Sequence, residues 1–132
     1  MAELAQPGQG AAGSDLSEGL LDTTLSRPRT GTVALAVRGE IDTLTAPAFT
    51  AATDELLTAP GDALVMDLTE VRFLASSGLA VLISAARRAE DRGVRLRLVV
   101  GSRAVRRPLE ITGTATLFEL HTDPESAYGG RD

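Results

Sequence analysis

The stretch FLASSGL, residues 73–79, decides the fold of this chain because two different patterns meet there. The nearly all-apolar ALVMDL before it, residues 63–68, predicts a central strand buried on both faces. The apolar residues after it recur at helical spacing, at Leu79, Leu82, Ile83 and Ala86. A strand therefore leads into a helix, with Ser76, Ser77 and Gly78 at the helix start. N–H groups at such a position attract an anion, which makes the two serines the first candidate site.

The residues before this stretch predict a hairpin and a helix. Two strand-like runs, 20–26 and 32–38, flank RPRTG at 27–31, whose Pro and Gly favour a turn. Thr45 is a good N-cap, and Pro47 suits the first turn, so a helix is expected from there to about Thr58.

The residues after it predict a strand, a short helix, a short strand and a terminal turn of helix. Gly93 is expected to end the helix that begins at the two serines. In residues 94–100 apolar side chains alternate with arginines, which predicts a strand with one face exposed to solvent. Ser102 is expected to cap a helix that reaches about Ile111, and a strand follows at 117–120. The order β-β-α-β-α-β-α-β predicts an α/β fold. We expect a mixed, mostly parallel sheet of four to five strands with helices layered on it.

Composition excludes several kinds of chemistry. The chain has 132 residues, no cysteine and one histidine, His121, so disulfides, thiol catalysis and histidine metal clusters are not expected. No metal or cofactor is predicted. No signal-like segment or apolar run near 20 residues is present, so we expect a cytoplasmic protein without membrane insertion. We expect a disordered tail at 1–19, one domain at 20–128 and a C-terminal tail at 129–132.

Charge is unevenly distributed. The net charge is −5, yet residues 87–107 hold eight arginines against Glu90 and Asp91, which gives +6. This arginine band is either a solvated helix end with one exposed sheet face, or a docking site for an acidic partner or nucleic acid. The acidic balance of the whole chain argues against direct nucleic-acid binding.

The ordered motifs resemble the STAS domain, and in particular the stand-alone bacterial anti-sigma factor antagonists. The motifs, which together cover roughly residues 20–128, are GEID at 39–42 with Thr45-Ala46, VMDL at 65–68 leading into 73–79, the strand 94–100, and SRAVRRPL at 102–109 followed by Thr112-Gly113 and Leu117-Phe118. The resemblance implies a protein that captures an anti-sigma factor serine kinase and so frees a sigma factor. The kinase phosphorylates the antagonist with ATP, and a phosphatase reverses the modification.

The resemblance also implies roles for single residues. Ser77, directly before Gly78, matches the phosphorylated serine, with Ser76 as the preceding hydroxyl, and Asp42 matches an acidic loop residue near the phosphosite. Ala75 stands where the family often has Asp, which removes both a cap and a charge that would repel a phosphate. The remaining residues expected near the phosphosite or at the partner surface are Thr45, Ala80, Val81 and Ser84.

Other interpretations start from the same residues. From the residues alone, the two serines could be only N-cap hydroxyls and Asp42 only a loop or capping residue. A hydrolase is not expected, because Ala75 and Leu79 replace the glycines of a nucleophile elbow and nothing places His121, expected at the surface, near Ser77. The protein is therefore not predicted to be an enzyme. STAS domains also occur as subunits of bacterial lipid-transport ATPase complexes, and a scaffold that works without phosphorylation is a third possibility.

Overall fold

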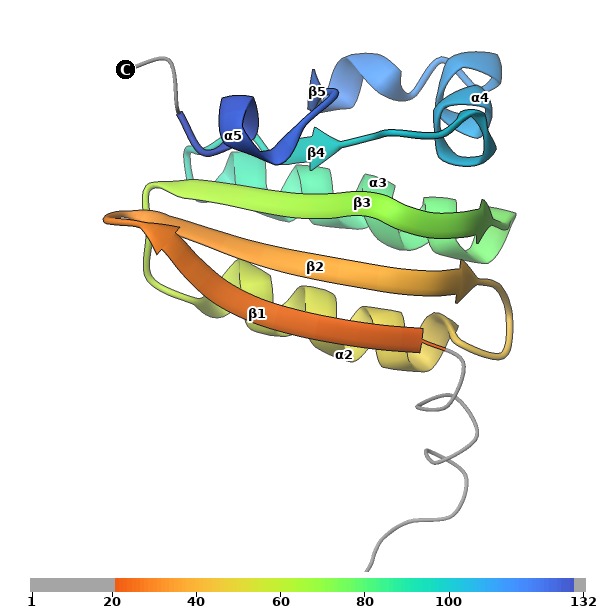
Figure 1. Cartoon of the computed structure of the whole chain (residues 1–132), viewed down its shortest axis with the longest axis horizontal. Coiled ribbons are helices and arrows are strands. Elements are labelled where there is room, and N and C mark those ends of the chain that lie inside the picture. The colour runs from red at the N-terminus through yellow and green to blue at the C-terminus, as the bar shows by residue number, and fades with distance from the viewer. Residues whose placement is uncertain (1–20, 130–132) are drawn as a thin grey trace, which may run out of the picture.

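The computed structural model describes residues 21–129, which build one five-stranded sheet with helices around it (Figure 1). The strands are β1 Leu21–Arg29, β2 Thr32–Ile41, β3 Ala63–Leu74, β4 Arg97–Val99 and β5 Glu119–His121. The helices are α2 Ala46–Thr58, α3 Ser76–Asp91, α4 Arg103–Ile111 and α5 Pro124–Ala127, with a 3-10 turn at Ala115–Leu117. The predicted tail at 1–19 and most of the predicted C-terminal tail lie outside the described residues.

The sheet is mixed and mostly parallel, as the element order predicts. The strands lie in the order β1-β2-β3-β4-β5; β1 pairs with β2 antiparallel, and the other neighbours are parallel. Because parallel strands end at the same edge of a sheet, the segments that follow β2 and β3 meet at one end of the molecule. That end carries the FLASSGL turn.

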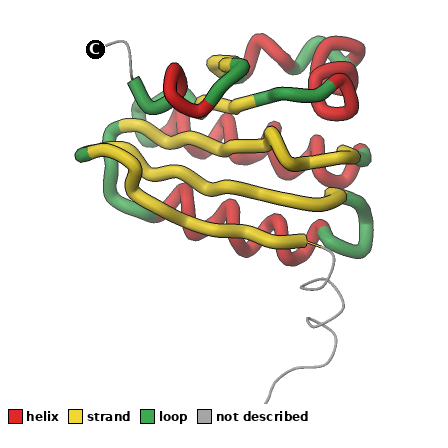
Figure 2. Tube along the Cα trace, viewed as in Figure 1, coloured by secondary structure: helices red, strands yellow, loops and turns green. Residues whose placement is uncertain are grey.

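The two faces of the sheet are covered differently. Helices α2 and α3 lie behind the strands in Figure 2 and bury the larger core, which includes Leu35, Phe49 and Leu82. On the opposite face the short helix α5 places Ala127 against a small second core, formed by Ala34, Val65 and Val99.

All five strands differ in length from the expectation. Strand β1 continues through residues 27–29, which were expected in the turn, and β2 continues beyond Arg38 to Ile41. Strand β3 continues beyond Leu68 to Leu74, because Val71 and Leu74 remain buried while Arg72 and Phe73 are exposed. Strand β4 spans only 97–99 rather than 94–100, and the last strand begins at Glu119 because residues 115–117 form a 3-10 turn. The helix end at Gly93 is confirmed, since this glycine has φ +84° and its N–H donates to the Glu90 carbonyl.

Most of the arginine band connects segments of the fold. Five of its eight arginines donate hydrogen bonds to distant or loop groups: Arg88 to Asp54, Arg92 to the Leu57 and Gly61 carbonyls, Arg95 to the Thr116 and Phe118 carbonyls, Arg97 to the Ala127 carbonyl, and Arg106 to the Val100 carbonyl. A merely solvated face is therefore too simple an account of the band. Carbonyl groups that helix and loop ends leave unpaired receive charged donors from it.

Candidate functional site

The two serines of the FLASSGL turn are the first residues of α3, at the edge where β2 and β3 end (Figure 1). The Ala75 N–H donates to the Ile41 carbonyl at 2.8 Å, which fixes the turn to the end of β2. The GEID segment and the serines, 35 residues apart in the sequence, are therefore neighbours in the fold.

Neither serine caps the helix. Ala75 occupies the N-cap position with extended backbone, and no side chain accepts a hydrogen bond there. The first helical bond runs from the Leu79 N–H to the Ala75 carbonyl at 3.0 Å. Within residues 21–129 the N–H groups of Ser76, Ser77 and Gly78 therefore have no acceptor. These three donors, with the positive end of the helix dipole, form a place for an anion.

The two serine hydroxyls differ in access. Ser76 is exposed, whereas the Ser77 Oγ is covered by protein and has no hydrogen-bond partner among the described residues. In this rotamer the Ser77 hydroxyl is therefore closed to solvent, and a change of χ1 to another staggered rotamer would turn it away from this position. This rotation breaks no hydrogen bond.

Gly78 brings α3 close to the ends of both strands. A Cβ at this position would lie 2.4 Å from the Ile41 Cγ2 and 2.8 Å from the Leu74 Cδ1, which is closer than carbon atoms can pack. Gly78 is itself buried, so it allows the close packing of the turn and does not form part of the exposed surface that a partner could contact.

The Asp42 loop is held by a reciprocal pair of hydrogen bonds. The Thr45 Oγ1 accepts from the Asp42 N–H at 2.9 Å and donates to the Glu40 carbonyl at 2.8 Å. The Thr45 N–H in turn donates to the Asp42 Oδ1 at 3.0 Å. The prediction that the Thr45 hydroxyl caps the helix is wrong, because it is buried and committed to this loop. Asp42 is half-buried and is oriented by these bonds.

Beyond the turn, α3 presents small residues to the surface. Ala80 and Ser84 are exposed, and Val81 is half-buried. All three line a shallow groove of about 220 Å³ between α2 and α3. Arg88 and Asp54 also line this groove and form an ion pair at 2.6 Å.

Two large apolar side chains near the turn were not singled out from the sequence. Leu44, in the loop after β2, is 52% exposed, and Phe73, near the end of β3, is 49% exposed. Because the parallel strands β2 and β3 end at the same edge of the sheet, both side chains lie at the end of the molecule that carries the turn. Their positions in the sequence offered a signal, because Leu44 closely follows the GEID motif and Phe73 is the first residue of FLASSGL.

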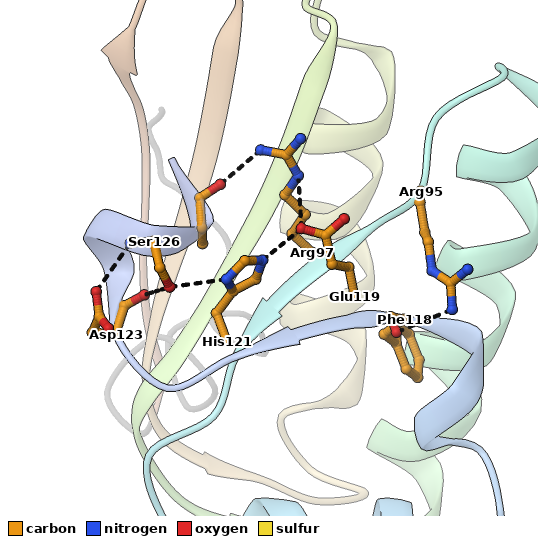
Figure 3. Close-up of polar contacts among 8 residues, drawn as sticks. Arg95, Arg97, Phe118, Glu119, His121, Asp123 and Ser126 are labelled. Carbon is orange, nitrogen blue, oxygen red and sulfur yellow. Dashed lines mark hydrogen bonds and ion pairs between the residues drawn. The ribbon is translucent and has the colours of Figure 1, made fainter. Parts of the chain in front are cut away.

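A second polar cluster lies under α5 (Figure 3). His121 contacts the Glu119 Oε2 through Nε2 at 2.7 Å and the Ser126 Oγ through Nδ1 at 2.9 Å. Arg97 donates to the Ala127 carbonyl at 2.8 Å and lies 3.5 Å from Glu119. His121 is thus half-buried in a cluster rather than a simple surface residue. In the sheet register His121 pairs with Val99, which pairs with Asp67, seven residues before the end of β3 at Leu74. The hydrogen bonds of His121 do not involve Ser77.

Tyr128 follows α5 and packs against the second core. Burial raises the pKa of its phenol, and the carboxylates of Asp67 and Glu125 raise this pKa further. Among residues 21–129 there is no group of three or more acidic, histidine or cysteine side chains placed to hold a metal ion. None of the helices in this part of the chain combines the length and apolar character needed to cross a bilayer.

Comparison with known proteins identifies the family of the chain. A sequence model of the STAS domain matches residues 25–127. The chain is 33% identical to the anti-sigma-F factor antagonist RsfB of Mycobacterium tuberculosis over 100 residues, which are 76% of this chain and 81% of that protein. It is 35% identical to the anti-sigma-B factor antagonist of Listeria monocytogenes over 88 residues, 67% of this chain and 77% of that protein. The crystal structure of an anti-sigma factor antagonist from Mycobacterium paratuberculosis is similar with a TM-score of 0.74 and 33% identity, covering 85% of this chain and 95% of that one. The chain belongs to the STAS domain family.

Proposed function

We propose that this protein is an anti-sigma factor antagonist that binds an anti-sigma factor serine kinase, and that phosphorylation of Ser77 switches the binding off. The observation that carries the proposal is the start of α3, where three N–H groups without acceptors in the described chain lie beside two hydroxyls that have no capping role. Two relatives of similar length are named as antagonists of this kind, which supports it.

A phosphate on Ser77 is expected to leave the fold intact. It adds about −1.5 to −2 charges at neutral pH, and the N–H groups and dipole of α3 favour a negative charge there by roughly 0.3–1 kcal/mol. Ala75 strengthens this effect, because an Asp at the N-cap would compete for the same N–H groups and would repel the phosphate.

The phosphate instead changes what a partner meets. Leu44 and Phe73 offer exposed apolar surface at the same end of the sheet, and Ala80 is small enough for close approach. A dianion beside such a surface must lose water when the partner docks, and it repels acidic groups on that partner. Each factor of ten in affinity needs only about 1.4 kcal/mol, so one phosphate is sufficient for a large switch.

The proposal includes the protein's surroundings. The partner is a serine kinase that is also the anti-sigma factor, and a phosphatase returns the antagonist to its binding form. The antagonist acts in the cytoplasm as a binding protein and not as an enzyme. The relatives reported above are antagonists, which favours this function over a lipid-transport subunit.

The direct test is a phosphorylation assay with the anti-sigma kinases of the same genome and ATP-Mg, followed by mass mapping. Ser77→Ala and Ser76→Ala form a matched pair, since each removes one hydroxyl from the same helical turn. We expect phosphate on Ser77 in the wild-type protein and in Ser76→Ala, and none in Ser77→Ala. Phosphate on Ser76, or none from a kinase that binds the protein, contradicts the assignment.

A further inference from the structure

Three arginines of the band differ from the other five. Arg87, Arg103 and Arg107 make no side-chain hydrogen bond or ion pair within residues 21–129, and all three are exposed. Arg103 and Arg107 stand four residues apart on α4, so they share one face of the helix. The opposite face is buried through Val105 and Leu109.

Strand β3, which α4 contacts, carries a further exposed arginine. Ser102, at the N-cap position of α4, does not cap the helix, and its Oγ lies 3.5 Å from the Val71 carbonyl of β3. The next residue of β3 is Arg72, which is also exposed and also lacks a partner in the described chain. We call Arg72, Arg103 and Arg107 the arginine patch.

The arginine patch lies at the functional end of the protein. In Figure 1, α4 is at the same end as the tip of β3 and the start of α3. Arg72 is five residues before Ser77 along the chain, in the strand that leads into the turn. Arg87 lies toward the other end of α3, away from the serines.

We infer that the arginine patch docks an acidic surface of the anti-sigma kinase, beside the apolar contact at Leu44 and Phe73. The inference rests on the proposed function. In a chain of net charge −5, arginines left without carboxylate partners complement an acidic partner. A nucleic acid fits less well, because residues 1–86 carry four arginines against eleven acids, a net −7 that would repel a phosphate backbone.

The patch also gives the Ser77 phosphate a second effect. A dianion at the start of α3 lowers the positive potential of the neighbouring arginine patch and at the same time repels the acidic surface that the patch attracts. Both effects weaken binding. The switch therefore depends on ionic strength, since interactions between exposed charges are screened beyond roughly 8–10 Å at physiological salt.

The test compares charge reversal inside and outside the patch. The variants are Arg103→Glu with Arg107→Glu, the milder pair Arg103→Gln with Arg107→Gln, and Arg87→Glu as the matched exposed control. Affinity for an anti-sigma kinase that binds the wild-type protein is measured at low and high salt. We expect the Glu pair to lose about tenfold or more at low salt, mainly in association rate, the Gln pair to lose less, and Arg87→Glu to stay close to wild type. The differences should narrow at high salt.

Several results would overturn the inference. Equal affinity of the Glu pair and the wild type at low salt, with melting temperatures unchanged, removes the patch from the interface and leaves the proposed function standing. A short DNA duplex bound by the wild type and released by the Glu pair would make the patch a nucleic-acid site instead. If no anti-sigma kinase binds the wild-type protein, the proposed function fails and this inference fails with it.

Discussion

The two ends of the sheet differ in whether their polar groups are hydrogen-bonded within the protein. Under α5, donors meet acceptors: Arg97 bonds the Ala127 carbonyl, and His121 bonds Glu119 and Ser126. At the start of α3, three N–H groups and the Ser77 hydroxyl have no partner in the described chain. Two buried side-chain atoms lack a partner in the described chain, the Ser77 Oγ and the Thr53 Oγ1 inside α2, and of the two only Ser77 lies at a helix start, where free N–H groups attract an anion.

This difference separates stability from function. The α5 end connects β4, β5 and the C-terminal helix by hydrogen bonds, so its side chains contribute to stability. The serine hydroxyls contribute no hydrogen bond to the fold, so they can be changed without unfolding the protein. Substitutions at the α5 end should therefore change the free energy of unfolding, and substitutions of the serines should change partner binding.

The largest expected effect is on binding at the Ser77 end. Ser77→Asp places a negative charge at the start of α3 and should weaken kinase binding by about 100-fold, or roughly 2.7 kcal/mol. The free energy of unfolding should change by less than about 0.5 kcal/mol, because the carboxylate can take a rotamer that faces solvent, where the helix dipole favours its charge. Titration calorimetry and urea unfolding measure the two quantities. If Ser77→Asp binds as tightly as the wild type, the electrostatic switch is wrong.

Regular patterns made the fold predictable from the sequence. The alternation of Val33, Leu35 and Val37 predicts β2, and the helical spacing after Gly78 predicts α3. Both are confirmed. The mixed sheet follows from the element order, because helical crossovers enforce parallel pairs. The change of pattern at residues 73–79 predicts that Ser76 and Ser77 begin a helix, which is also confirmed.

Contacts between distant segments were not predictable in the same way. The hydroxyl of Thr45 bonds the preceding loop and does not cap the helix, because the Asp42 N–H and the Glu40 carbonyl lie within hydrogen-bond distance of it. Four of the five bonded arginines of the band donate to backbone carbonyls, as Arg97 does to Ala127, and such acceptors carry no sequence signal. The packing of Gly78 against Ile41 depends on a strand 37 residues away.

The next effect is on the packing that positions the site. Gly78→Ala would improve helix propensity by about 1 kcal/mol, but its Cβ cannot fit 2.4 Å from the Ile41 Cγ2. We expect a net loss of about 1–3 kcal/mol of stability, as for other overpacked cores. Gly101→Ala is the matched control, since its Cβ would lie 3.5 Å from Thr69 in ordinary contact. Equal urea midpoints for the two variants would show that the backbone of the turn shifts to accommodate the added Cβ at little cost in stability.

A smaller effect is expected at the α5 end. Arg97→Met leaves the Ala127 carbonyl without its charged donor, and we expect a loss of about 1–2 kcal/mol. The contact with the partly exposed Glu119 adds little. Kinase binding should be unchanged, which is the reverse of Ser77→Asp. Arg87→Met, which removes an exposed arginine with no partner in the described chain, should leave stability within about 0.5 kcal/mol. Weaker kinase binding by Arg97→Met would mean that the two ends are coupled.

The smallest effect is a pH dependence that belongs to the α5 end alone. Burial and the carboxylates of Asp67 and Glu125 raise the pKa of Tyr128, so the folded state holds the phenol proton more tightly than the unfolded chain does. The resulting stability is fully present below the ordinary tyrosine pKa of about 10, and it is lost as pH rises through the raised pKa. The chain contains one tyrosine, no lysine and no cysteine, so no other kind of side chain has its ordinary pKa between about pH 9 and 11. Urea unfolding across this window should show a steeper loss for the wild type than for Tyr128→Phe. Parallel pH profiles would mean that the phenol titrates alike in the folded and unfolded chains, and that α5 does not shield it.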